Sequence, residues 1–200
     1  MTTMLDIIGA TIIAGMIMLI IFGVTTNLNQ TLYMSTFSLN VQTSAVALAR
    51  EVEYDFLKMG YNINKSTSTI ILAADSNRIR FKCDLFNVGI VDTMGYWTGS
   101  LLSLTRNPRD RVFTRVRRNS SVNESINADL GVTNFSLTYY DSLGTKMSTP
   151  VVSDSARKRI KSIKVKIYIE SPEPVAKSYD QTDTSYVGVY WEKLIYPRNL

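Results

Sequence analysis

The chain has 200 residues, a formal net charge of +5 and a pI near 9.3, which leaves room for one membrane anchor and one domain of ordinary size. It contains no His and a single Cys, so the usual zinc ligand sets, Ser-His-Asp and Cys-His catalytic arrangements and an intrachain disulfide are excluded. We therefore do not expect an enzyme, and we assign no catalytic residue, no metal ligand and no cofactor.

An uncharged apolar run from Ile7 to Val24 dominates the first 27 residues. At about 1.5 Å per residue it reaches about 27 Å as a helix, close to the roughly 30 Å hydrocarbon core of a bilayer. It lacks the basic start and the A-x-A-like exit of a secretory signal peptide, so we expect it to be retained. Residues 1–27 are therefore predicted to form a transmembrane or filament-core helix.

Small residues suited to close helix packing recur in this run, namely Gly9, Ala10, Gly15 and Gly23. Glycine is also simply tolerated in membrane helices, so the pattern alone does not establish a packing face. Asp6 stands at the start of the run. Its position fits a carboxylate favoured by the helix dipole as well as one that has a specific partner.

Residues 28–60 continue the helical period with a polar side and an apolar stripe. Lys58 and Gly60 indicate where the helix ends. The stripe is expected to dock on a sheet, and packing against other copies of the chain is the alternative. Its residues are Leu28, Leu32, Leu39, Val46, Ala49, Val52, Phe56 and Met59.

After Tyr61 the apolar period changes from helical to alternating, which predicts an antiparallel β-sheet head over residues 61–200. Cys83 falls on the inward face of one expected strand and is predicted to be a core residue. Polar loops are expected at 119–131 and 171–184. The expected strands are 69–73, 78–85, 90–97, 101–105, 111–117, 135–140, 163–170 and 186–196.

The segment from Arg106 to Arg118 holds six Arg against the single Asp110. Alternation puts Arg111, Arg115 and Arg117 on one strand face. This face is either solvated and protective against edge pairing, or a basic surface that meets an acidic neighbouring subunit. No nucleic acid partner is expected, because the cluster lacks an interleaved aromatic platform.

Asp180 and Asp183 lie in the expected loop after residue 170. Two carboxylates without further oxygen ligands at suitable spacing are a weak cation signal. We therefore interpret them as solvated acids.

The order of an anchor helix, its amphipathic extension and an antiparallel head resembles the type IV pilin superfamily, in particular its larger minor pilins and pseudopilins. The resemblance covers nearly the whole chain. It implies an α+β fold class in which a long N-terminal α-helix, hydrophobic in its first half, packs on an antiparallel β-sheet head. The residues that carry it are Thr2–Asp6, Phe135–Asp141 with Gly144, Ile160–Val165 and Pro197–Leu200.

The resemblance implies a structural subunit that waits in the inner membrane, with a single span and its head outside the cytoplasm, before it enters an extracellular or periplasmic filament. Its implied partners are other pilin-like subunits, membrane lipid before assembly and the membrane assembly machinery. If Thr2 were the first mature residue, Asp6 would fall where the family has Glu and would pair with a neighbour's N-terminal amine. The alternative is a membrane-anchored exported binding domain that does not polymerise.

Overall fold

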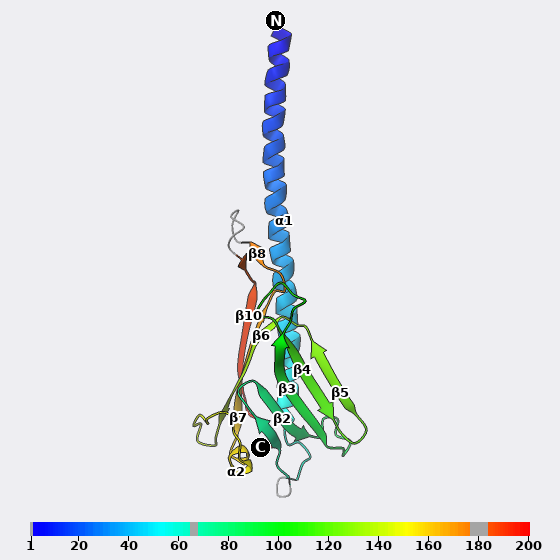
Figure 1. The fold of residues 1–200 in the computed structure, drawn as a ribbon, viewed down its shortest axis with the longest axis vertical. Coiled ribbons are helices and arrows are strands. Elements are labelled where there is room, and N and C mark those ends of the chain that lie inside the picture. Colours follow the sequence, from blue (N-terminus) through cyan, green and yellow to red (C-terminus); the bar gives the residue numbers. More distant parts are fainter. Residues whose placement is uncertain (1, 65–67, 177–183) are drawn as a thin grey trace.

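The computed structural model describes residues 2–64, 68–176 and 184–200, and one long helix dominates its shape (Figure 1). Helix α1 (Thr2–Leu57) has 56 residues and is about 84 Å long. It runs without a break from the apolar segment into the head. The chain then turns at Gly60, whose φ of 72° suits glycine; a Cβ there would lie 2.7 Å from the carbonyl oxygen of Asn199.

The head is built from two antiparallel sheets and a two-stranded ladder. The five-stranded sheet has the order β1-β2-β3-β4-β5, the three-stranded sheet has the order β10-β7-β6, and the ladder pairs β8 with β9. A short helix, α2 (Asp154–Lys158), precedes β7. The strands are β1 (Ile71–Ala74), β2 (Arg78–Cys83), β3 (Asp92–Leu101), β4 (Arg111–Arg118), β5 (Asn123–Ala128), β6 (Val132–Tyr140), β7 (Ser162–Glu170), β8 (Val175–Ala176), β9 (Thr184–Ser185) and β10 (Gly188–Ile195).

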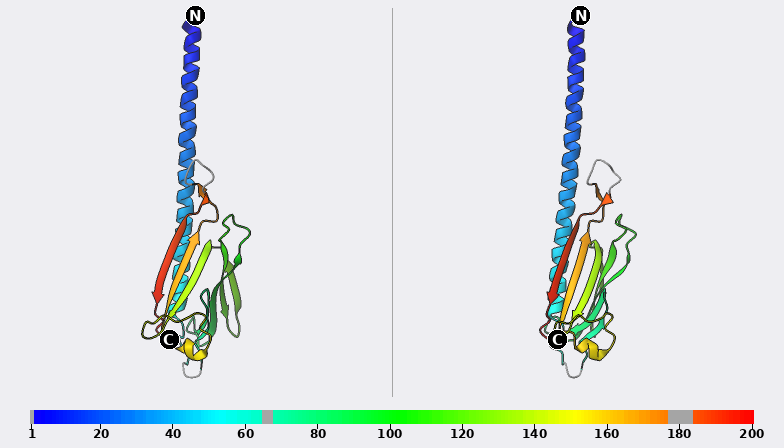
Figure 2. Two further views of the ribbon diagram at one scale, coloured as in Figure 1. Left: turned by 60° about the vertical axis from the view of Figure 1, so that its left-hand side comes forward. Right: turned by 90° about the vertical axis from the view of Figure 1, so that its left-hand side faces the viewer.

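The second half of α1 lies against both sheets, while the first half projects beyond the head (Figures 1 and 2). Strand β10 runs along α1, and β6, at the other edge of its sheet, faces the five-stranded sheet. Backbone hydrogen bonds link the five-stranded sheet to the rest of the head. Leu137 of β6 donates to the Ser76 carbonyl, between β1 and β2, at 2.7 Å, and Val151, between β6 and α2, donates to the Ala74 carbonyl of β1 at 2.9 Å. The head is therefore one packed unit.

A chain of aromatic rings crosses the core from the helix to the three-stranded sheet. Phe56 of α1 meets Tyr96 of β3 with ring centroids 5.7 Å apart, and Tyr96 meets Phe113 of β4 at 5.9 Å. Phe113 in turn meets Phe135 of β6 at 5.2 Å in an edge-to-face contact. Tilted and edge-to-face pairs at these distances add to the stability gained from burial alone. The expected fold class, a long N-terminal helix on antiparallel β-structure in a pilin-like α+β arrangement, is confirmed.

Only part of the predicted apolar stripe of the helix packs on the head. Val52, Phe56 and Met59 are fully buried, as expected. Four members of the predicted stripe are exposed instead, and the docking face is completed by residues that the stripe did not include. The exposed four are Leu28, Leu32, Leu39 and Val46, and the added residues are Val41, Ala45 and Leu48.

The head departs from the predicted strands in several places. Residues 92–101 form the single strand β3, with a register shift between Thr98 and Leu101, where two strands were expected. Strand β5 occupies part of the expected 119–131 loop, because it is an edge strand with almost wholly exposed side chains and so shows no apolar alternation. The strands divide into two sheets and the β8–β9 ladder, not one sheet, and β8 lies within the expected 171–184 loop. Asp180 and Asp183 lie outside the described residues.

Candidate assembly surface

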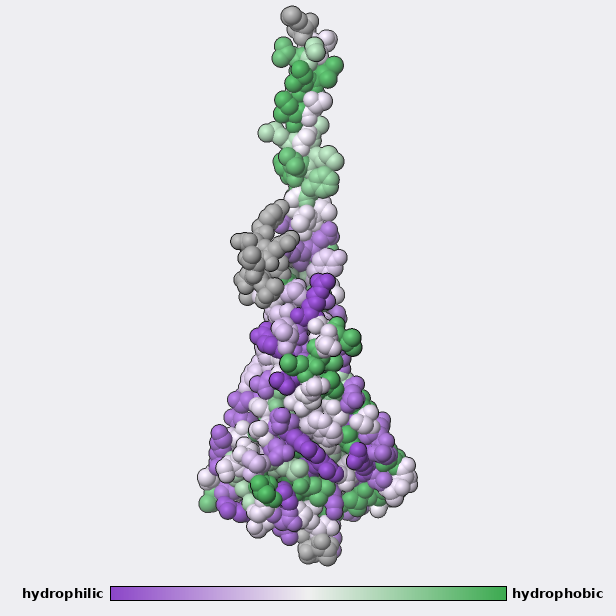
Figure 3. Space-filling model, in the orientation of Figure 1, coloured by the Kyte–Doolittle hydropathy of each residue, from purple (hydrophilic) through white to green (hydrophobic). Residues whose placement is uncertain are grey.

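The first half of α1 has no cover from the part of the head that the structure describes. No residue in its most apolar window is buried, and the helix is long and apolar enough to cross a membrane. In Figure 3 this half is a shaft of hydrophobic side chains above a largely hydrophilic head. An exposed apolar surface of this extent is typical of a membrane or protein contact. Its large side chains, 50–73% exposed, include Ile7, Ile8, Ile12, Ile13, Met16, Ile17, Leu19, Ile20, Ile21 and Phe22.

Six threonine hydroxyls of α1 donate hydrogen bonds to carbonyls of the preceding turn. Thr11 donates to the Ile8 carbonyl at 2.9 Å, and Thr25 donates to the Ile21 carbonyl at 2.8 Å. A hydroxyl that donates a hydrogen bond to a carbonyl of the preceding turn can enter an apolar environment without leaving its donor unsatisfied. The same local bond is made by Thr26, Thr31, Thr36 and Thr43. The threonines beyond Val24 therefore do not prevent this part of the helix from facing an apolar environment.

Asp6 is exposed at the start of this bare helix, and no charged residue follows it before Arg50. The glycines of the helix are not required by the chain's own packing, since a Cβ at Gly9, Gly15 or Gly23 would have nothing within 4 Å. The roles assigned to Asp6, to these glycines and to Ala10 in contacts between subunits remain predictions.

A second apolar stripe runs along the part of α1 that carries the head. Leu28, Leu32, Leu39 and Val46 are 49–64% exposed. Their spacings of four and seven residues place them on one side of the helix, well away from the buried side that contains Val52 and Phe56. This outer stripe (Leu28, Leu32, Leu39 and Val46) continues the bare surface toward the head.

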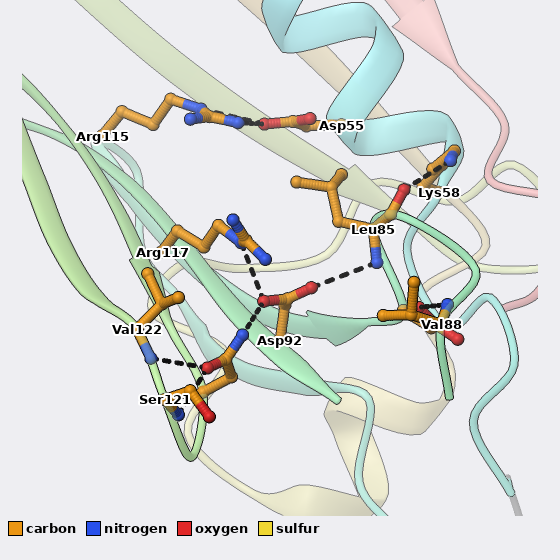
Figure 4. Close-up of polar contacts among 11 residues, drawn as sticks. Asp55, Lys58, Leu85, Val88, Asp92, Arg115, Arg117, Ser121 and Val122 are labelled. Carbon is orange, nitrogen blue, oxygen red and sulfur yellow. Dashed lines mark hydrogen bonds and ion pairs between the residues drawn. The ribbon is translucent and has the colours of Figure 1, made fainter. Parts of the chain in front are cut away.

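A buried polar cluster fastens α1 to the five-stranded sheet (Figure 4). Asp55 is 1% exposed, and its Oδ2 accepts bonds from Tyr96 Oη at 2.5 Å and from Arg115 Nε and Nη2 at 3.0 and 2.8 Å. Glu51, one turn earlier, gives Arg115 a second carboxylate at 3.0 Å. Burial, and after it the charge of Asp55, raises the pKa of the Tyr96 hydroxyl well above its usual value, so this hydroxyl remains a donor.

A second buried carboxylate lies on the same face of the sheet. Asp92 is 0% exposed, and its carboxylate accepts bonds from Arg117 Nε at 2.8 Å, Asn119 Nδ2 at 2.8 Å and the Leu85 backbone N–H at 3.3 Å (Figure 4). Every acceptor oxygen therefore has a partner, which limits the cost of burying the charge.

These pairs correct the prediction of a solvated basic face at Arg111, Arg115 and Arg117. Arg115 and Arg117 have side chains only 16% and 17% exposed, because both turn toward α1 and the buried acids. Arg111 is half-buried, and its guanidinium donates to the Gly99 carbonyl at 3.4 Å. The alternation along β4 correctly predicted that the three arginines share one face of the strand. It could not show that this face points inward, because the acids that pair with Arg115 and Arg117 come from elements distant in the sequence.

The exposed basic surface of the sheet is its other face, which the sequence reasoning did not single out. Arg78 and Arg80 of β2 lie beside Trp97 of β3 and Arg118 of β4 around a hollow of about 220 Å³. The Arg78 guanidinium lies 5.4 Å from the centre of the Trp97 ring. Figure 3 shows hydrophilic side chains over this part of the head. Alternation from Arg78 to Asp84 could have located this face.

Cys83 is fully buried in the core, as predicted. Burial raises the pKa of its thiol to about 12, so the reactive thiolate is not formed at neutral pH.

An apolar, uncovered N-terminal helix half and a second half packed on antiparallel sheets together make up a pilin-like α+β fold. The chain is similar to a type IV-like pilin from Thermus thermophilus, with a TM-score of 0.49 and 14% identity over 80% of this chain and 94% of that one. No protein-family model and no curated protein sequence matches the chain.

Proposed function

We propose that this chain is a structural subunit of a type IV pilus-like or type II secretion pseudopilus-like filament, and that its function is assembly and not catalysis. The observation that carries the proposal is the bare first half of α1. It is joined without a break to a half that is firmly packed on the head, so the chain presents a long apolar rod that its own described residues leave uncovered.

The outer stripe supports packing of this rod against sister rods more than simple anchoring. A membrane anchor needs apolar residues only across the bilayer, and the run to Val24 already has that length. Leu28, Leu32 and Leu39 lie beyond it on one side of the helix and are left exposed. A bundle of neighbouring helices would cover these side chains.

In this proposal the subunit first resides in the inner membrane with its head outside the cytoplasm, and the membrane assembly machinery then moves it into an extracellular or periplasmic filament of pilin-like subunits. Lipid is as apolar as a helix bundle, so leaving the bilayer brings little hydrophobic gain. The net stabilisation must come from close packing, to which Gly9, Ala10, Gly15 and Gly23 would contribute, and from polar pairing.

Asp6 would supply the polar pairing. A carboxylate within an apolar bundle is costly unless a positive group meets it, and the N-terminal amine of a neighbouring subunit has the required charge. The pair would therefore fix the register between neighbouring subunits, because a misplaced subunit would leave Asp6 unpaired in the bundle.

The test compares Asp6→Ala and Asp6→Asn with Asp6→Glu, which keeps the charge, in cells that produce the chain and its assembly partners. Sheared filaments and membranes are separated and the full-length chain is quantified in each. We expect wild type and Asp6→Glu in the sheared fraction, and the two neutral variants held in the membrane with folded heads. Equal filament yield for all four chains would refute the pairing role of Asp6.

The same fractions decide between this proposal and an anchored binding domain that does not polymerise. A wild-type chain that remains strictly with the membrane, with no filaments in electron micrographs, would overturn the filament proposal.

A further inference from the structure

The outward face of the five-stranded sheet carries positive charge that no acid on that face balances. Arg80 of β2 stands opposite Gly95 of β3, which in turn stands opposite Val116 of β4. Directly opposed residues share one face of an antiparallel sheet, and alternate residues along a strand return to it. From β2 to β5 this face contains four basic residues and no acid among its described positions. Those positions are Arg78, Arg80, Lys82, Thr93, Gly95, Trp97, Thr114, Val116, Arg118, Asn123, Ser125 and Asn127.

Three arginines of this face surround one hollow. Arg78, Arg80 and Arg118 all line the space of about 220 Å³ described above. Within the described parts of the chain none of their guanidinium groups has an ion pair or a hydrogen bond, and Arg78 has only the Trp97 ring beside it. The inward arginines of β4, by contrast, each pair with a buried acid. Like charges that converge repel one another, so an anion among these three would be stabilised.

The hollow is open because position 95 has no side chain. A Cβ on Gly95 would lie 2.9 Å from Cζ3 of Trp97 and 3.3 Å from Cγ of Arg80, so any larger residue would fill the space between them. The φ of Gly95 is not positive, so the backbone itself does not require glycine there. Glycine in the interior of a strand weakens the strand and is typical of places where another group approaches closely.

The size and charge of the hollow indicate the kind of ligand. A volume of about 220 Å³ is below the roughly 300–1,000 Å³ of pockets that enclose a whole small molecule, so the hollow fits one terminal group. Guanidinium groups form paired hydrogen bonds with carboxylates and with phosphates. A carboxylate presents only two oxygens, whereas a phosphate presents oxygens toward several arginines at once. The Thr93 hydroxyl also lines the hollow, has no hydrogen bond within the described ranges and can donate one more.

We propose that this hollow is a binding site for a tetrahedral oxyanion of the phosphate type, either the free ion or a phosphate ester at the end of a larger molecule. Arg80 on β2 and Arg118 on β4 approach from the two sides of β3 and bind its oxygens. Helix α1 packs on the opposite face, where Asp55 meets Arg115, and so does not cover the hollow. The site lies wholly on the head, so the proposal does not depend on filament assembly.

The experiment titrates sodium phosphate into the full chain in a non-ionic detergent at neutral pH, with NaCl adjusted to keep the ionic strength constant. Proton–nitrogen NMR spectra follow the two indole N–H groups. Trp97 lines the hollow, and Trp191 of β10 is the internal reference. We expect a saturable shift of the Trp97 signal alone, with a Kd in the millimolar range because exposed charge pairs are individually weak.

Two variants and a matched control test the arginines. Arg80→Gln and Arg118→Gln should each weaken phosphate binding by about tenfold, because each removes charge-assisted hydrogen bonds. Arg198→Gln removes the same charge from an exposed residue that does not line the hollow, and should leave the Kd unchanged. Arg118 is exposed, so its variant keeps the test decisive even if Arg80→Gln does not fold.

Titrations with sodium acetate and methyl phosphate complete the test. Acetate, with two oxygens and a single charge, should bind more weakly than phosphate. Methyl phosphate that binds as tightly as inorganic phosphate would identify an ester as the natural form of the ligand, and its exclusion would identify the free ion. The absence of a saturable shift at Trp97, equal binding of acetate, or an unchanged Kd in Arg118→Gln would overturn the proposal.

Discussion

Removing Asp55 is expected to loosen the attachment of α1 to the head. Its carboxylate accepts three bonds, two of them from Arg115, whose side chain is 16% exposed. Breaking a buried ion pair from one side costs about 3–5 kcal/mol, because the remaining charge stays buried and unpaired. Glu51, at 3.0 Å from Arg115 and 46% exposed, keeps part of that compensation, so we expect Asp55→Ala to cost about 3 kcal/mol.

Two matched variants separate the contributions. Asp55→Asn preserves the shape and an acceptor for Tyr96 but removes the charge, so a loss of about 1–2 kcal/mol is expected. Glu51→Gln removes the exposed carboxylate and should cost less than about 1 kcal/mol. The assay is urea unfolding of the full chain in detergent, followed by the fluorescence of Trp97 in β3 and Trp191 in β10. A loss below about 1 kcal/mol for Asp55→Ala, or an equal loss for Glu51→Gln, would refute the assignment of Asp55 as the main fastening residue.

Two further predictions concern the outer stripe and Asp110. Leu39→Asn should keep the free energy of unfolding within about 0.5 kcal/mol of wild type, because Leu39 is 60% exposed, but should lower the filament yield. The control Leu143→Asn, at a head residue that is 88% exposed, should change neither quantity. Equal filament yields for the two variants would count against the outer stripe as a contact between subunits. Burial, and after it the charge of Asp129, raises the pKa of Asp110 to about 6, so the folded chain binds this proton more tightly than the unfolded chain. The stability contributed by Asp110 is therefore full below about pH 4 and is lost as the pH rises through about 6, by at most about 3 kcal/mol. Asp110→Asn should remove that loss in urea titrations between pH 4 and 7, and an unchanged pH profile would contradict the shift.

The helix and the main strands could be predicted because their signals are local. The apolar run, the stop at Gly60 and the alternation in β2, β6 and β7 are properties of neighbouring residues, and each element forms where expected. Strand β5 could not be predicted, because an edge strand with exposed polar side chains has no apolar period to detect.

The candidate surface was harder to predict because its decisive contacts join distant residues. The inward direction of Arg115 depends on Asp55, which is 60 positions earlier in the chain. The helix stripe was assigned from its period alone, and period does not distinguish an apolar side that docks on the head from one that is left for another molecule. The structure separates the two sides, and the exposed one contains Leu28, Leu32, Leu39 and Val46.

The unbroken backbone of α1 links its bare first half mechanically to the half that is packed on the head. The helix contains no Pro, the commonest cause of a sharp bend, and its hydrogen-bond ladder continues from the bare half into the part held by Asp55 and Phe56. A head fastened by buried charge pairs and a ring cluster cannot tilt freely against that rod. In the proposed filament, contacts between rods would therefore fix the positions of the heads as well, and weakening the Asp55 cluster should disorder the heads while the rods still assemble.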